Sequence, residues 1–177
     1  LLFINMENMK QLIYKPTQNR KTYEIILNIL SQIGTSINIV FTDNLCMLGS
    51  QTSDRIIKEI DGVTMYTTDI AKTISIHCES YDIGGVSRKQ IATHIYGLIR
   101  MDGVRNIITL TNSVRLPQIK ELVNLLLKRD TFGSDPVVPT YIKKVNMYFD
   151  EADKTIKLIR RGFCEVLNNE NIDDIYI

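Results

Sequence analysis

The chain contains few of the residues that build metal and redox sites. Its 177 residues include two histidines, His77 and His94, and three cysteines, Cys46, Cys78 and Cys164. The cysteines are far apart and form no C-x-x-C pair, and neither histidine has a second ligand at metal spacing. We therefore expect no bound metal and no cofactor. We expect the cysteines to be buried thiols in a reducing compartment.

Catalytic motifs are missing as well. The sequence contains no G-x-S-x-G, no phosphate loop and no dinucleotide fingerprint. In "IHCES" a strand would point His77 and Cys78 to opposite faces, which argues against a nucleophile and its base. We expect no intrinsic enzymatic activity, and a small enzyme with an unrecognised site is the third and least favoured hypothesis.

Neither an excess of charge nor a long apolar run is present. Lys and Arg number 21 against 20 Asp and Glu, so whole-chain charge gives no sign of non-specific attraction to nucleic acid or membranes. The apolar start "LLFIN" is too short for a signal sequence and has no basic residue before it. No segment approaches the roughly 20 apolar residues of a membrane span. We expect an intracellular protein that does not contact membranes.

The first half reads as alternating helices and strands. In "NRKTYEIILNILSQIG" the apolar residues recur at helical spacing before Gly34, and "INIVF" has the β-branched character of a strand. Residues 45–60 fit either a strand and turn or a short helix from near Ser53, and we favour the helix. "VTMYTTD" and "KTISIHCES" predict two strands that form a hairpin or lie adjacent.

The clearest unit follows. Ser87 and Gln90 form a capping-box pattern for a helix that extends to about Met101, and "VRNIITLT" is a strongly β-branched strand. Residues 112–116 form a loop, and Pro117 suits the first turn of the next helix, "QIKELVNLLLKR". This order indicates a small α/β module.

Periodicity breaks at "DTFGSDPVVP", where we place a boundary between Thr131 and Pro136. Beyond it, "IKKVNMYF" and "TIKLIRR" are strand-like, and the end of the tail suits an edge strand. We predict an α+β fold with an α/β module over residues 1–130 and a small, mostly β module over residues 131–177.

A weak internal sequence repeat raises a further hypothesis. The segments that begin at Asn19 and Ser87 align without a gap as helix, turn and strand, and they share an Asn-Ile pair in the strand. Pattern alone explains such a match about as well as duplication does. If the repeat is real, it suggests a stand-alone clamp-like or saddle-like DNA-binding factor.

Two segments are candidates for function. The loop "TNSVRLPQ" carries Arg115, and loops of this kind hold functional residues more often than helix faces do. A plain strand-to-helix connection with a solvated arginine is the alternative. Asp135-Pro136 makes a rigid corner before the basic strand "KTIKLIRR", which is either a docking surface or a half-buried strand after a simple turn.

These pieces resemble the small jaw and assembly subunit shared by the eukaryotic RNA polymerases I, II and III, a family that also has archaeal members. "SDPVVPTY" and "TIKLIRR" are similar to that family's Asp-Pro corner and its basic strand, in the same order. "GVSRKQIATHIYGLI", "VRNIITLT" and "NSVRLPQIKEL" are similar to its N-terminal jaw. The family's His-x-Leu-Val-Pro-x-His junction has no counterpart, since no histidine follows His94.

The resemblance implies a non-catalytic polymerase subunit in the nucleus, or in the cytoplasm or virion if the protein is viral. It implies that the C-terminal module docks on the largest polymerase subunit and contacts the other subunits. The docking residues would be Asp135, Pro136, Lys157, Arg160 and Arg161. It also implies that the N-terminal module lies near downstream DNA, with Arg115 and Pro117 closest to it.

Overall fold

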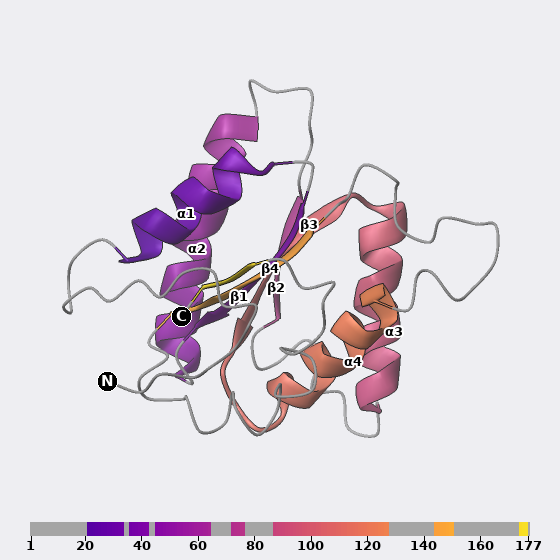
Figure 1. Ribbon diagram of the computed structural model, residues 1–177. Coiled ribbons are helices and arrows are strands. Elements are labelled where there is room, and N and C mark those ends of the chain that lie inside the picture. The colour runs from indigo at the N-terminus through magenta and orange to yellow at the C-terminus, as the bar shows by residue number, and fades with distance from the viewer. Residues whose placement is uncertain are drawn as a thin grey trace.

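The structure of the protein is a computed structural model (Figure 1). It describes residues 21–33, 36–42, 45–64, 72–76, 87–127, 144–150 and 174–176. Its helices are α1 Lys21–Ser31, α2 Cys46–Thr64, α3 Arg88–Met101 and α4 Arg115–Leu127. Its strands are β1 Ser36–Thr42, β2 Lys72–Ile76, β3 Val104–Leu110, β4 Lys144–Phe149 and β5 Asp174–Tyr176.

The strands form one sheet in the order β2-β3-β1-β4-β5, and each described pair is parallel. The first strand of the described chain, β1, is therefore the central one. Asn38 of β1 stands opposite Asn106 of β3 on one side and Asn146 of β4 on the other.

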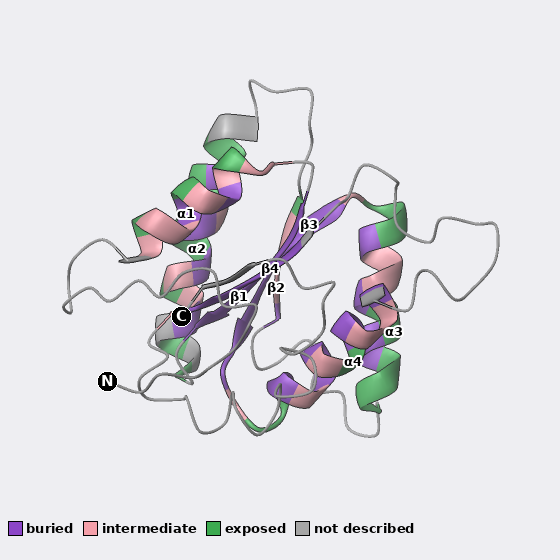
Figure 2. Cartoon of the chain, in the orientation of Figure 1, coloured by how far each residue is buried: buried purple, intermediate pink, exposed green. Residues whose placement is uncertain are grey.

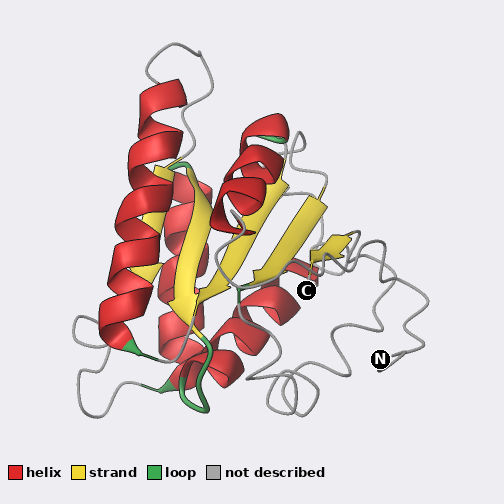
Figure 3. Cartoon of the chain, turned by 90° about the vertical axis from the view of Figure 1, so that its left-hand side faces the viewer, coloured by secondary structure: helices red, strands yellow, loops and turns green. Residues whose placement is uncertain are grey.

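Helices cover both faces of this sheet. α1 and α2 pack on one face, and α3 and α4 pack on the other (Figures 1 and 3). The connection through α2 runs from the centre to the β2 edge, whereas those through α3 and α4 run back in the opposite direction on the opposite face. A crossover that runs in the opposite direction on the opposite face has the same hand. The connections through α2, α3 and α4 therefore all share one hand, as the rule of right-handed crossovers requires.

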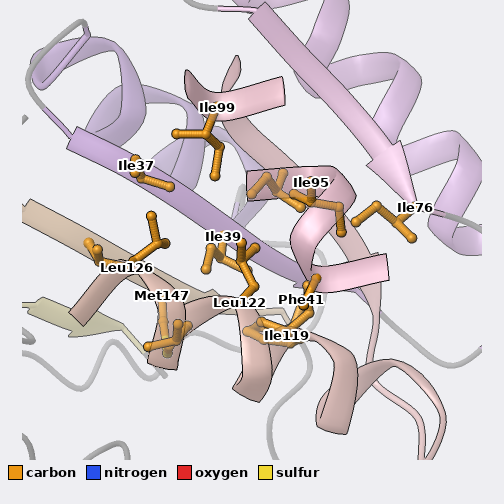
Figure 4. Packing of buried hydrophobic residues seen from close by; sticks show 14 of the residues in the cluster. Ile37, Ile39, Phe41, Ile76, Ile95, Ile99, Ile119, Leu122, Leu126 and Met147 are labelled. Atoms are coloured by element: carbon orange, nitrogen blue, oxygen red, sulfur yellow. The ribbon is translucent and has the colours of Figure 1, made fainter. Parts of the chain in front are cut away.

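The α3/α4 face holds the larger hydrophobic core (Figure 4). The sheet supplies alternate residues of β1 and β4 to it, and the rings of Phe41 and Phe149 stack with centroids 4.5 Å apart. Leu122 and Ile95 on the covering helices are fully buried against them. Truncation of such a residue to Ala costs about 2–5 kcal/mol.

The α1/α2 face holds a smaller apolar cluster beside buried polar side chains. Ile29, Val40 and Ile60 belong to this cluster. Along β1, the residues on this face are Ser36, Asn38, Val40 and Thr42, all buried. The two faces therefore differ in chemistry although both are covered.

Local sequence signals explain the ends of α3. The Ser87 side chain accepts a hydrogen bond from the Gln90 amide, and the Gln90 side chain accepts one from the Ser87 amide. At the other end Gly103 takes a positive φ of 72°, which a glycine adopts without strain. The buried Arg105 guanidinium then donates to the carbonyl of Ile99 at the C-terminal end of the helix.

The mixed α+β fold predicted from the sequence is confirmed, as are the capping box and the edge position of the last strand. Residues 46–60 are helical, as favoured, but α2 begins at Cys46, earlier than the predicted start near Ser53. The strand predicted from Val63 is wrong at its beginning, because α2 extends through Thr64. Its remainder lies outside the described residues.

The sheet also continues across the predicted module boundary. The sequence predicts a separate C-terminal module over residues 131–177, and the structure instead pairs β4 directly with β1 and β5 with β4. Parallel strands need long crossovers, so neighbouring strands in a sheet can be far apart in the sequence. The boundary residues themselves lie outside the described residues.

The internal sequence repeat matches the structure in its strands but not in its helices. The gapless alignment sets Asn38 against Asn106, and the sheet pairs these same two residues. However, α1 and α3 lie on opposite faces of the sheet, so the two helix-strand units do not superpose (Figure 1). The open concave face that a saddle-like factor requires is also covered by helices.

Candidate functional site

The loop between β3 and α4 is tied to the neighbouring strand. The amide and the hydroxyl of Thr111 both donate to the Thr42 carbonyl, at 3.0 and 2.7 Å. The Asn112 side-chain oxygen then accepts from the amides of Val114 and Arg115, at 3.1 and 2.8 Å. This geometry is that of a helix N-cap. The loop is therefore held in place by hydrogen bonds at both ends, and Ser113 and Val114 within it are exposed.

Arg115 is buried, with 1% of its surface exposed. Its Nη1 donates to the Gln118 side-chain oxygen at 2.9 Å, one turn along the same helix. The sequence predicts Arg115 in a solvent-exposed loop near DNA, whereas the structure makes it the first residue of α4 with an inward side chain. It can reach a phosphate only if the start of α4 rearranges.

The other candidate residues are divided between described and undescribed segments. Pro117 is half-buried in the first turn of α4, as its sequence position predicts. The docking residues Asp135, Pro136, Lys157, Arg160 and Arg161 all lie outside the described residues, as does His77. His94 is exposed on α3.

The carboxyl ends of β1 and β3 are where open α/β sheets usually bind ligands. After these adjacent strands the chain leaves toward opposite faces, through α2 and α4, which creates a topological switch point. Here the Asn112 side chain accepts hydrogen bonds from two of the amides at the start of α4, and the Thr111 side chain hydrogen-bonds to the end of β1. The described part of this edge therefore offers no free anion cradle.

A row of polar side chains crosses the sheet beneath α1 and α2. Asn146 Nδ2 donates to Asn38 Oδ1 at 3.0 Å, Asn38 Nδ2 donates to Asn106 Oδ1 at 2.8 Å, and Asn106 Nδ2 donates to Thr73 Oγ1 at 3.2 Å. We call Thr73, Asn106, Asn38 and Asn146 the polar row. Its three asparagines are at most 1% exposed.

The polar row is incompletely satisfied at one end. Asn146 Oδ1 is buried and has no hydrogen-bond partner among the described residues, although its Nδ2 also donates to Gln32 Oε1 at 2.9 Å. Sequence reasoning missed the row because alternating polar residues in a strand usually indicate a solvent-facing side. The available signal was an asparagine followed by an apolar residue in three separate strands.

Metal and membrane features are absent from the described part of the chain. No cluster of three His, Cys, Asp or Glu side chains suited to a metal ion occurs among the described residues. None of the described helices combines the length and apolar character needed to cross a bilayer. Comparison of the chain with protein-family models and with curated proteins finds no match.

Proposed function

We propose that this protein is a non-catalytic subunit of a multisubunit DNA-dependent RNA polymerase. In this proposal the C-terminal segment, residues 131–177, docks on the largest subunit through Asp135, Pro136, Lys157, Arg160 and Arg161, and residues 1–130 lie near downstream DNA. The observation that carries the proposal is the run from β2 to α4. It combines α3, which a Gly-Val pair precedes in the sequence, the β-branched β3 and a proline in the first turn of α4, in the order that the jaw resemblance implies.

The character of the described chain supports an architectural role. The buried side chains are engaged in packing and in the polar row, and the carboxyl edge of β1 and β3 is closed by Thr111 and Asn112. We infer that this part of the chain positions partners rather than substrates.

Native co-purification tests the proposal. The tagged full-length chain, expressed in its own host, should recover the largest polymerase subunit, identified by mass spectrometry, together with DNA-dependent RNA synthesis in the eluate. Recovery of the chain alone, or with proteins unrelated to transcription, contradicts the proposal.

Charge reversal tests the docking segment within the same assay. The triple variant Lys157→Glu, Arg160→Glu and Arg161→Glu should lose most of its polymerase recovery, since each reversed charge at a partly desolvated interface costs on the order of 2–5 kcal/mol. The matched control reverses Arg55, Lys58 and Lys72, which are exposed on α2 and β2, and should be recovered as well as wild type. Equal recovery of both triple variants places the docking surface elsewhere.

A further inference from the structure

Helix α3 presents cationic side chains to solvent. Arg88, Lys89 and Arg100 are exposed, and the helix contains no acidic residue. Figure 2 shows exposed residues toward both ends of this helix, on the outer side of the molecule. The chain as a whole is nearly neutral, so this excess of positive charge is local.

Two of the three cations are not placed for the stability of the helix, whereas Arg100 lies in the last turn, where the helix dipole favours a cation. Arg88 and Lys89 occupy the first turn, where the helix dipole is positive, and no acidic residue accompanies them. Cations at this end are disfavoured by about 0.3–1 kcal/mol each. The capping box of Ser87 and Gln90 satisfies backbone amides but supplies no negative charge. A negatively charged partner would remove this cost.

A glycine in the middle of α3 is likewise not explained by packing. A Cβ built at Gly97 meets no atom within 4 Å. Glycine inside a helix is less stable than alanine by roughly 0.5–1 kcal/mol. The absence of a side chain at this position does, however, allow another molecule to approach the backbone closely.

Two of the cations and the glycine lie on one side of the helix. Lys89, Thr93, Gly97 and Arg100 follow one another at intervals of three or four residues, which places them in a single stripe. The stripe is about 16 Å long at 1.5 Å per residue. At its first end lies an open hollow of about 440 Å³. Its described lining is Ser87, Lys89, Gln90, Thr93 and His94.

We propose that this α3 stripe binds the phosphate backbone of a DNA duplex. Two cations separated by a small residue and a glycine suit an elongated polyanion that approaches closely, and each DNA strand carries one phosphate per about 3.4 Å of axis. The proposal rests on the proposed function for its setting, in which the duplex is the downstream DNA. It assigns the contact to α3 in place of the buried Arg115.

Salt-dependent binding by the full chain tests the stripe. We would measure fluorescence anisotropy of a labelled 20-base-pair duplex from about 50 to 200 mM salt. Wild type should bind with a slope of log K against log salt of about −2, because each neutralised phosphate contributes about −0.9. Lys89→Glu with Arg100→Glu should lower affinity at least about tenfold and remove most of the slope. The control pair Arg55→Glu and Lys58→Glu on α2 should bind as wild type does.

Gly97→Ala provides a second test that does not depend on a destabilised variant. It should raise the unfolding midpoint and weaken duplex binding, whereas Gly62→Ala on α2, where a Cβ also meets no atom within 4 Å, should leave binding unchanged. Unchanged duplex binding in both α3 variants overturns the proposal. A preference for a polyglutamate peptide over the duplex also overturns it.

The two proposals fail separately. If the chain binds the duplex through α3 but does not co-purify with polymerase, the α3 stripe proposal stands and the polymerase proposal fails. If the chain co-purifies with polymerase and its α3 variants bind DNA normally, the polymerase proposal stands and the α3 stripe proposal fails.

Discussion

Replacing two asparagines of the polar row should have very different consequences. In Asn38→Leu, the side chain that links β3 to β4 loses both its donor and its acceptor while its branching at Cγ is kept. Asn106 Oδ1 then loses its donor inside the protein, because Asn38 Nδ2 is its 2.8 Å partner. An unsatisfied buried polar group costs about 1–3 kcal/mol, and the lost bonds within a connected network add to it.

We expect Asn38→Leu to lower the free energy of unfolding by about 2–4 kcal/mol. Asn146→Leu, in contrast, removes a buried oxygen that already lacks a partner among the described residues. It also removes the two bonds that Asn146 Nδ2 donates, but Asn38 Oδ1 keeps the Ser36 hydroxyl at 3.2 Å, and Gln32 is only half-buried, so water can replace its lost donor. We expect it to change the free energy of unfolding by less than about 1 kcal/mol. Overpacking by leucine is shared by the two variants and largely cancels in the comparison.

Urea denaturation followed by circular dichroism measures the difference. With a urea slope of roughly 2 kcal/mol/M, the midpoint of Asn38→Leu should fall by about 1–2 M relative to wild type, with little change for Asn146→Leu. The slope must stay constant for the midpoints to report stability. Equal midpoint shifts in the two variants would refute the assignment of the network and of its unsatisfied end.

Three further predictions concern α3 and α4. Ser87→Ala should lower the free energy of unfolding by about 1 kcal/mol, measured by denaturation, because it removes the cap of α3. Arg115→Ala should lower it by about 1–3 kcal/mol in the same assay, since it leaves Gln118 Oε1 without this donor and opens space in the core; a variant as stable as wild type would mean that the arginine is not packed as described. Burial raises the pKa of Tyr96 above 10.0, partly opposed by Arg100, so the unfolded chain ionises first and stability falls as pH rises above about 10. Tyr96→Phe should lose less stability than wild type over that pH range, and identical pH profiles would contradict it.

The elements that the sequence predicts correctly are those with local signals. The capping box of Ser87 and Gln90, the β-branched run of β3 and the apolar spacing of α1 each depend on residues within a turn or two of one another. Strand order has no local signal, because the polar contacts of Asn38 join residues 68 and 108 positions apart. For this reason the sequence predicts a separate C-terminal module where the structure has one continuous sheet.

The site shows the same division. Pro117 is in the first turn of a helix, as its spacing predicts, because proline constrains its own backbone. The burial of Arg115 depends on which way the start of α4 turns toward the sheet, and a linear pattern does not contain that information. The polar row was missed because its partners lie on strands that meet only in the folded sheet.

The central position of β1 has a consequence for synthesis of the chain on the ribosome. Both of its neighbours, β3 and β4, are made after it, and Asn146 follows Asn38 by 108 residues. At about 5–20 residues per second, the second neighbour emerges some 5–20 s later. Until β3 emerges, "INIVF" is an unpaired, β-branched segment with free backbone groups on both sides, and until β4 emerges one side remains free. Exposed strand edges of this kind are prone to aggregation. The β1 edge that β4 covers therefore stays exposed until Lys144–Phe149 has been made.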